Sequence, residues 1–219
     1  MAAAHAHPSW DDSYVGAPPP WDIGRPQVAF VRLAEAGLLS GELLDAGCGT
    51  GEHTILAASH GAAALGIDVS SRAIDAACRK ARERSSGAAF EVLDAMAIGG
   101  QGRRFDTVID SGLLHVFDDD ARPRYVAALH GSLRAAGHLH LMCFSDQEPG
   151  DWGPTRMTEG ALRALFGSGW RIESIAPARF EINAISDAST AEAWLLDVVR
   201  LPSSEPGPAT HKGAPGIVS

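Results

Sequence analysis

Cysteine is scarce in this chain, with three among 219 residues. Cys48, Cys78 and Cys143 show no C-x-x-C pairing, and they fall within apolar stretches or a glycine-rich turn. This usage argues against a disulfide framework and indicates a reducing compartment. We therefore expect a cytoplasmic protein.

Basic residues are also few: 18 Lys and Arg stand against 27 Asp and Glu, a net charge of −9. An acidic chain without a basic stripe is a poor candidate for binding nucleic acid or an anionic membrane. No apolar run reaches transmembrane length, and residues 1–7 lack the basic start and long apolar run of a secretory signal. We expect no nucleic acid, no membrane and no metal as partners, and a monomer or homodimer.

Large aliphatic residues are sparse at both ends of the chain. Residues 202–219, PSSEPGPATHKGAPGIVS, cannot bury enough apolar surface to fold, so a disordered tail is predicted. Residues 1–20 are similar but contain Trp10 and Tyr14, which favours a partly disordered arm that can order over a ligand as a lid. Residues 21–201 are long enough for one domain with a substantial core.

Between the ends, strand-like and helix-like patterns alternate, which is typical of an α/β fold with a doubly wound sheet. The last two apolar segments, 170–182 and 191–201, predict an antiparallel hairpin, although the second could equally be a helix. Helices are expected at 26–36, at 51–60 with Thr50 as its cap, from Ser70 or Ser71 to Arg84, from the acids at 118–120 to Gly137, and at 158–166. The other strands are expected at 42–46, 63–68, 89–93, 105–110 and 138–144, which makes about seven in all.

Residues 42–69, ELLDAGCGTGEHTILAASHGAAALGIDV, are the most informative stretch. They read as a strand, a glycine turn, a helix and a second strand that ends in Asp68, a unit that binds nucleoside-containing cofactors. A dinucleotide fingerprint needs a third small residue where Glu52 stands, and a carboxylate there would repel a pyrophosphate. The pattern therefore favours a ligand without phosphate and with a positive charge, and disfavours an NAD-dependent oxidoreductase.

The string LLDAGCGTG resembles the first motif of the class I S-adenosylmethionine-dependent methyltransferases. The resemblance implies a Rossmann-like sheet of seven strands, mostly parallel with an antiparallel C-terminal strand. It also implies S-adenosyl-L-methionine as cofactor and S-adenosyl-L-homocysteine as product. The loop would wrap the amino-acid end of the cofactor through Gly47, Cys48, Gly49 and Gly51.

Acids stand at the ends of four expected strands: Asp45, Asp68, Asp94 and Asp110. Ligands bind at the carboxyl ends of strands in such sheets, although Asp is also a common turn and cap residue. By resemblance, Asp68 holds the ribose and Asp110 lies on the methionine side, while Asp45 contacts the cofactor or orients the glycine loop. The neighbours expected around the adenine and the methionine side are Val69, Asp94 with Ala95 and Met96, and Ser111.

The segment 19–27, PPWDIGRPQ, precedes the glycine motif. It resembles the PWDxGR segment of the thiopurine and halide/thiol methyltransferases and of bacterial enzymes that methylate small heterocycles. By resemblance, Trp21 packs against the ligand, and Asp22, Gly24 and Arg25 belong to a lid. The alternative is a clamp that fixes the entry helix to the sheet.

The segment 110–117, DSGLLHVF, lacks the Asn- or Asp-Pro-Pro-aromatic run of enzymes that methylate nucleobase amines. Ser111 and Gly112 leave room beside the reactive methyl group. His115 is a candidate general base because its ordinary pKa lies near neutrality; lining the pocket and a purely structural role are the alternatives. The acceptor pocket is expected to contain Trp10, Tyr14, Trp21, Leu113, His115, Phe117, Phe144 and Trp152.

Together these features predict methyl transfer to S, O or N of a small aromatic or heterocyclic molecule by in-line displacement. A thiol or halide methyltransferase is an alternative within the same chemistry, and a protein methyltransferase is a more distant one. A non-catalytic scaffold that binds S-adenosylmethionine is the alternative of a different class, and a missing acceptor cavity would be its sign.

Overall fold

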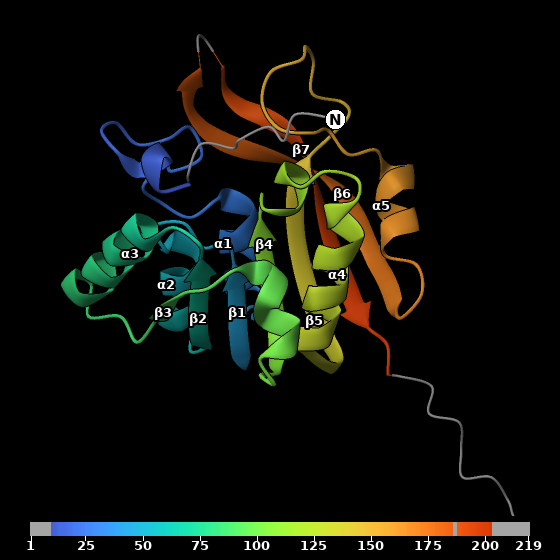
Figure 1. Cartoon of the computed structure of the whole chain (residues 1–219), viewed down its shortest axis with the longest axis horizontal. Coiled ribbons are helices and arrows are strands. Elements are labelled where there is room, and N and C mark those ends of the chain that lie inside the picture. Colours follow the sequence, from blue (N-terminus) through green and yellow to red (C-terminus); the bar gives the residue numbers. More distant parts are fainter. Residues whose placement is uncertain (1–9, 186–187, 203–219) are drawn as a thin grey trace, which may run out of the picture.

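The computed structural model describes residues 10–185 and 188–202, and a seven-stranded sheet runs through them (Figure 1). The strand order is β3-β2-β1-β4-β5-β7-β6. The strands are β1 Glu42–Ala46, β2 Ala63–Asp68, β3 Ala89–Val92, β4 Phe105–Ser111, β5 Leu133–Phe144, β6 Trp170–Ile185 and β7 Ala188–Arg200.

Strands β1 to β5 pair in parallel, and β7 runs antiparallel to both of its neighbours, β5 and β6. The predicted fold class is therefore confirmed: a doubly wound, Rossmann-like α/β sheet, mostly parallel with an antiparallel C-terminal strand. The hairpin prediction is also confirmed, and the segment that could have been a helix is strand β7.

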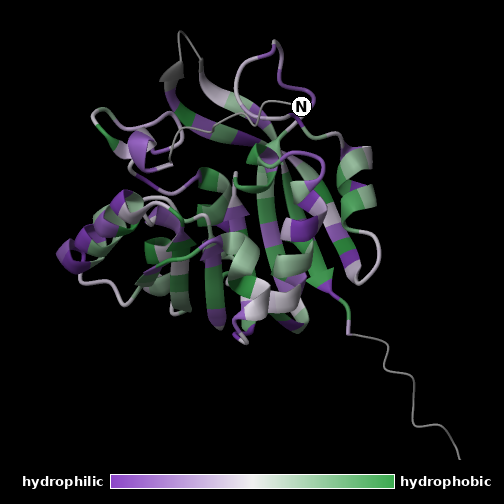
Figure 2. Ribbon diagram, viewed as in Figure 1, coloured by the Kyte–Doolittle hydropathy of each residue, from purple (hydrophilic) through white to green (hydrophobic). Residues whose placement is uncertain are grey.

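Helices cover both faces of the sheet, because neighbouring residues of each central strand point to opposite sides. Leu43, Ile109 and Met142 join the core beneath α1 and α2, while Leu44 and Val108 join the core beneath α4 and α5. Figure 2 shows hydrophobic residues along the strands between the helices, with hydrophilic ones among them. The helices are α1 Val28–Glu35, α2 Glu52–Ser59, α3 Ser71–Glu83, α4 Ala121–Ser132 and α5 Glu159–Leu165, with short 3-10 turns η1 Trp10–Tyr14, η2 Ala95–Gly100 and η3 Leu114–Val116.

Two of the described α-helices begin with a side-chain cap. Ser70 caps α3 by accepting a hydrogen bond from the Ala73 amide at 3.1 Å, and Thr158 caps α5 in the same way. Thr50 does not cap α2, which was predicted wrongly. Its hydroxyl instead donates to Asp22 and accepts from Lys80, and Gly51 stands at the cap position.

The junction between α4 and β5 was also predicted wrongly. The helix ends at Ser132 rather than at Gly137, and β5 begins at Leu133 rather than at His138. Between Phe105 and Thr107 of β4 the register shifts, because β5 contains a bulge there with Ala136 at φ +60°. A helical periodicity cannot show such a bulge in advance.

The described residues contain no helix that is both long and apolar enough to cross a membrane. The predicted tail beyond Pro202 and the first nine residues of the arm lie outside the described residues. From Trp10 onward the arm has a defined course over the carboxyl edge of the sheet (Figure 1).

The close packing at Gly51 leads us to expect that a larger residue there destabilises the fold, and Gly61 provides a matched control. Gly51 and Gly61 both have positive φ, +85° and +93°, but a Cβ on Gly51 would lie 2.7 Å from the Phe90 ring, whereas Gly61 faces open space. Gly51→Ala should therefore lower the free energy of unfolding by about 1–3 kcal/mol more than Gly61→Ala. Urea unfolding measures both, and equal losses would mean that backbone strain alone matters at these positions.

Candidate active site

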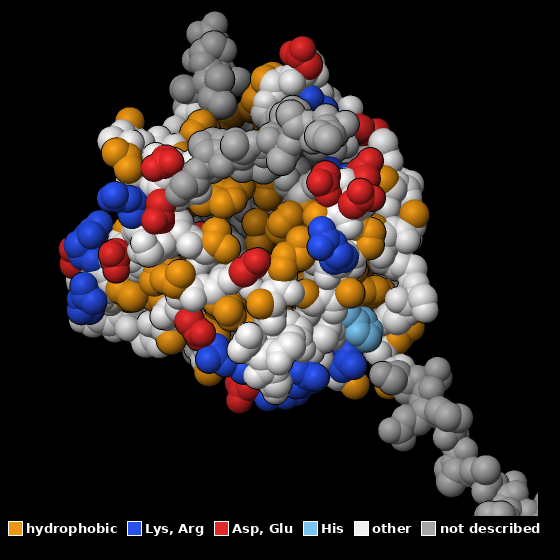
Figure 3. Space-filling view, in the orientation of Figure 1, with side chains coloured by type: hydrophobic (Ala, Val, Ile, Leu, Met, Phe, Trp, Pro, Cys, Tyr) orange, Lys and Arg blue, Asp and Glu red, His pale blue; other side chains and the backbone are white. Residues whose placement is uncertain are grey.

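A cavity of about 620 Å³ opens where β1, β2 and β4 end. Figure 3 shows a central hollow in which hydrophobic side chains gather. The glycine loop, the ends of β2 and β4, the arm and the far end of β6 all contribute to its wall. This is the edge of a doubly wound sheet at which ligands bind.

The glycine loop is held across the end of β2 by its own backbone. The amides of Gly47 and Cys48 both donate to the Ile67 carbonyl at 2.9 Å. Gly47, Gly49 and Gly51 have φ of +72°, +53° and +85°, a backbone region that glycine enters without the strain a Cβ would add. The loop therefore presents bare backbone at Gly47 and Gly49 to the cavity.

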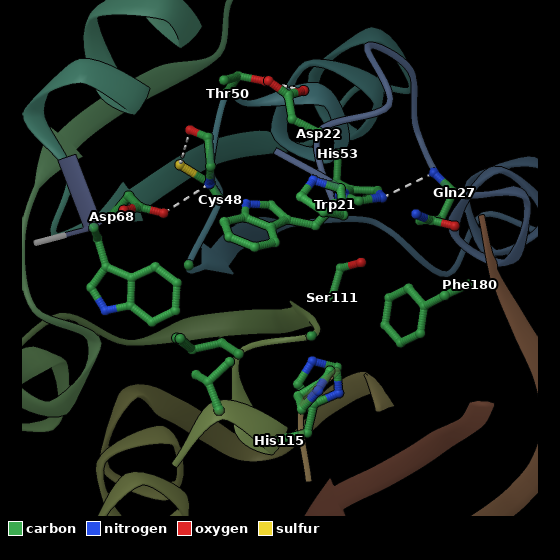
Figure 4. A pocket seen from close by; sticks show the side chains of 18 of the residues that line it. Trp21, Asp22, Gln27, Cys48, Thr50, His53, Asp68, Ser111, His115 and Phe180 are labelled. Atoms are coloured by element: carbon green, nitrogen blue, oxygen red, sulfur yellow. Dashed lines mark hydrogen bonds between the residues drawn. The ribbon is translucent and has the colours of Figure 1, made fainter. Parts of the chain in front are cut away.

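Asp68 faces this loop from the end of β2 (Figure 4). Its carboxylate accepts hydrogen bonds from the Gly49 amide at 2.9 Å and the Ser70 amide at 2.8 Å. Burial raises the pKa of Asp68, and the two amide bonds oppose that rise. A carboxylate has about four acceptor positions, so capacity is left for hydroxyl groups in the cavity.

Glu52 lies on the wall, but it is not an unpaired charge. Its carboxylate pairs with Lys80 at 2.8 Å and with Arg84 at 2.7 Å, and these cations hold its pKa below the ordinary value despite burial. The expectation that Glu52 would repel a pyrophosphate by its charge therefore needs correction. A bulky ion-paired side chain replaces the small third residue of the dinucleotide fingerprint, and its charge is compensated.

Three residues predicted to contact a cofactor stand behind the cavity wall instead. The carboxylate of Asp45 is 1% exposed and accepts from the Thr54 hydroxyl at 2.6 Å. Asp110 is 0% exposed and accepts from the amides that begin η3 and from the Tyr125 hydroxyl. Gly51 packs against Phe90. Burial raises the pKa of both acids to about 7.

His115 has a fixed proton arrangement. Its Nδ1 accepts a hydrogen bond from the Phe144 amide at 2.9 Å, so the neutral ring carries its proton on Nε2. Burial lowers the pKa of His115 to about 3, with a further contribution from Arg122. Nε2 lies toward Gly112, 3.3 Å from where a Cβ would stand. This arrangement does not suit the general base that the sequence suggested.

Aromatic rings surround His115 and close one end of the cavity. The centroids of Phe144 and Phe180 lie 5.1 and 5.7 Å from the His115 ring, and Trp152 packs edge-on against Phe144 at 5.6 Å. All the residues predicted for an acceptor pocket line this one cavity: Trp10, Tyr14, Trp21, Leu113, His115, Phe117, Phe144 and Trp152. So do Trp21, Gly47, Cys48, Gly49, Asp68, Val69, Asp94, Ala95, Met96 and Ser111 of the predicted cofactor set.

The segment 19–27 is tied to both sides of the cavity. On the loop side, the Thr50 hydroxyl donates to Asp22 at 2.9 Å. On the β6 side, the Gln27 amide group bonds the Glu181 backbone in both directions at 2.8 Å, and the Asn183 amide donates to the carbonyls of Pro19 and Asp22. The segment is therefore a clamp on the sheet as well as part of the cavity roof, where Trp21 donates to the Tyr14 hydroxyl.

Known proteins resemble this chain in sequence and in fold. The methyltransferase domain family matches residues 43–137. A 2-heptyl-1-hydroxyquinolin-4(1H)-one methyltransferase of Mycobacteroides abscessus is 34% identical over 172 residues, which is 77% of this chain and 76% of that protein. The probable thiol methyltransferase 2 of Arabidopsis thaliana is 27% identical over 141 residues, 64% of this chain and 62% of that protein.

Among solved structures, one described with the conversion of a disulfide bond into a thioacetal group during echinomycin biosynthesis is 40% identical. It covers 84% of both chains with a TM-score of 0.75. The chain belongs to the class I S-adenosylmethionine-dependent methyltransferases. Its cofactor is S-adenosylmethionine, and the resemblance drawn from LLDAGCGTG is confirmed.

The residues of this methyltransferase fit that cofactor. The bare loop at Gly49 leaves space beneath Tyr14, whose hydroxyl lies 3.2 Å from where a Cβ would stand. The spare acceptor positions of Asp68 suit a ribose, and the cavity is lined mainly by apolar and aromatic groups rather than by cations. A wall of this kind suits a sulfonium and an adenine better than a pyrophosphate.

Sequence reasoning missed several residues on the wall, among them His53 and Phe180, and used Gln27 only as part of a motif. The backbone N–H of Gln27 donates to His53 Nε2 at 3.1 Å (Figure 4), and burial lowers the pKa of His53 to about 4. Phe180 comes from β6, over sixty residues beyond His115 in the chain. The sequence pointed to Gln27 only as the last residue of the segment 19–27, and no local pattern pointed to Phe180.

The raised pKa of Asp45 predicts a specific pH dependence. Between its ordinary value of 3.8 and about 7, the folded protein holds a proton that the unfolded chain has lost, so the free energy of unfolding falls as the pH rises. Asparagine does not titrate, so the free energy of unfolding of Asp45→Asn does not fall in this way. The difference between the variant and wild type should therefore shift in favour of the variant across that window, by no more than about 4 kcal/mol.

Urea unfolding of both proteins on either side of the window measures this difference, and a gap that stays constant with pH would contradict it. Asp106→Asn is the matched control, because the Glu42 amide and Arg134 hold the pKa of Asp106 below its ordinary value. Its deficit relative to wild type should shrink as the pH falls.

Proposed function

We propose that this methyltransferase methylates S, O or N of a small, flat aromatic or heterocyclic acceptor whose nucleophilic atom ionises without a protein base. One observation carries the proposal: beside Gly112 the cavity has a wall of aromatic rings. The Phe180 ring lies 3.5 Å from where a Cβ on Gly112 would stand, and Phe144 packs against both Phe180 and Trp152; we call this part of the cavity the chamber. Flat apolar molecules bind well in such chambers. A bare halide would leave most of its surface uncovered.

The named relatives support this acceptor class. One is named for a 1-hydroxyquinolin-4(1H)-one, a flat bicycle with a hydroxyl on nitrogen, and another for a thiol. Each such group is more acidic than an alcohol, so it can lose its proton before methyl transfer. The arrangement of His115 requires this of the acceptor, since neither ring nitrogen is free to take a proton there.

His115 acts instead as a hydrogen-bond donor in this proposal. Its Nε2–H points toward Gly112 at the mouth of the chamber, where an anionic or carbonyl oxygen of the acceptor would receive it. The Phe144 amide fixes the tautomer, and the rings of Phe144 and Phe180 fix the orientation. A preorganised donor of this kind positions the acceptor and stabilises its charge.

The cofactor, when bound, supplies a methyl group made electrophilic by a sulfonium. The chain contributes alignment and exclusion of water, of which proximity and orientation can supply about 7–11 kcal/mol. Asp68 would hold the ribose, while Val69, Asp94, Ala95 and Met96 would surround the adenine. The roof formed by Tyr14 and Trp21 would cover the reacting atoms. That the protein is cytoplasmic, and that it is a monomer or a homodimer, remain predictions.

Transfer of labelled methyl from S-adenosylmethionine to a panel of acceptors tests the proposal. We expect N-hydroxyquinolones, aryl thiols and acidic phenols to be methylated with kcat/KM well above that for iodide or an aliphatic thiol, because only the flat acceptors fill the chamber. Phe180→Ala should lower kcat/KM for the bicyclic acceptors and leave iodide unchanged. Faster turnover of iodide would favour the halide alternative, and cofactor binding without any turnover would favour the scaffold alternative.

The donor role of His115 predicts a pH profile. Wild-type kcat/KM for an acceptor that is already anionic should show no titration near the ordinary histidine pKa of 6.5. His115→Leu should lower kcat/KM by roughly 10- to 100-fold, the value of one hydrogen bond to a charged group. His115→Gln, which retains an N–H donor, should recover part of the loss.

Cofactor affinity by calorimetry serves as the control, since neither variant should change it. An inflection near the ordinary histidine pKa that disappears in His115→Gln would restore the role of general base.

A further inference from the structure

Two histidines and an aspartate lie together on one face of the sheet near the middle of β5, away from the methyl-transfer site. His138 and His140 are two residues apart on β5, so they share a face. Asp197 stands directly opposite His140 on β7. One nitrogen from each ring and a carboxylate oxygen all lie within 4.8 Å of one another.

The contacts in this cluster are incomplete. His138 Nδ1 lies 2.9 Å from an Asp197 oxygen, and His140 Nδ1 lies 3.7 Å from the same oxygen. The His140 side chain is 1% exposed, and among the described residues neither of its ring nitrogens makes a hydrogen bond of good geometry, although the Leu38 backbone and the Asp197 carboxylate lie close to the ring. A buried polar group without a well-formed hydrogen bond destabilises a fold, so we expect a further ligand to use these ring nitrogens.

The cluster has the donors and the spacing of a metal site. Ligand atoms that surround a zinc ion tetrahedrally at 2.0–2.1 Å stand roughly 3.3 Å apart, between the two contacts given above. His138 and Asp197 are partly exposed, at 41% and 27% of their side chains, which leaves an entry path and room for a water ligand.

No pattern in the sequence indicates a set of metal ligands, but the fold brings these three residues together. Against the expectation of no metal, we propose that His138, His140 and Asp197 bind one borderline divalent transition-metal ion, zinc foremost, and so link β5 to β7. Two imidazoles and one carboxylate suit this class of ion, whereas magnesium and calcium prefer oxygen ligands alone. The ion joins β5, which carries Phe144, to β7, which pairs with β6 on its other side.

The ion stands apart from the reacting atoms. Phe144 is four residues beyond His140 on β5, a distance of about 13 Å along a strand. The proposal therefore does not rest on the acceptor assigned above. It predicts an effect on stability and not on the methyl-transfer step.

Calorimetric titration of zinc into the full chain, expressed without a histidine tag and stripped with chelator, tests the site. We expect one zinc per chain and a higher Tm, with no response to magnesium or calcium. His138→Ala and Asp197→Asn should each weaken zinc binding by at least about 10- to 100-fold, the range that loss of a supporting residue alone produces at metal sites. These substitutions are preferred to replacement of the buried His140, which could prevent folding.

Other histidines supply the controls. His5 and His7 have the same spacing but lie outside the described residues, so the double variant His5→Ala/His7→Ala must retain the site. His60→Ala, on the exposed end of α2, should also bind like wild type. Zinc binding that disappears with His5 and His7, or that survives unchanged in both His138→Ala and Asp197→Asn, would overturn the proposal, as would the absence of saturable binding.

Discussion

The methyltransferase site depends on one set of backbone hydrogen bonds, those that fix the glycine loop over the end of β2. Two loop amides share the Ile67 carbonyl, and a third bonds the Asp68 carboxylate. Because the loop is built on the adjacent parallel strands β1 and β2, its position follows from the core beneath them. The arm, the Thr50–Asp22 contact and the paired Glu52 are then arranged around a loop that is already in place.

The elements of this fold could be predicted from sequence where local pattern and tertiary position agree. Strand β1 and strand β2 begin and end where the alternation of apolar runs and acids indicates, and Ser70 caps α3 as its chemistry predicts. The α4–β5 junction could not be predicted, because a bulge with Ala136 at positive φ is set by pairing with β4 rather than by local preference.

The candidate site shows the same division. Asp68 and Asp110 both end strands, and nothing in the local sequence distinguishes them. The side chain of Asp68 faces the cavity. That of Asp110 lies under η3, where it accepts hydrogen bonds from backbone amides and from the Tyr125 hydroxyl. The wall at Phe180 and the tautomer of His115 depend on contacts between residues far apart in the chain, which no local pattern encodes.

The clamp between the arm and β6 has a consequence for how the enzyme becomes active during synthesis. Gln27 and Glu181 are separated by 154 positions, and Pro19 and Asn183 by 164. The roof of the chamber therefore has only its anchor on the loop side, the Thr50–Asp22 contact, until nearly the whole chain has left the ribosome. Contacts of such long sequence separation form late, because the chain between them must be ordered first. The glycine loop and Asp68 stand much earlier in the sequence than β6, so this part of the wall is synthesised long before the residues that complete the chamber.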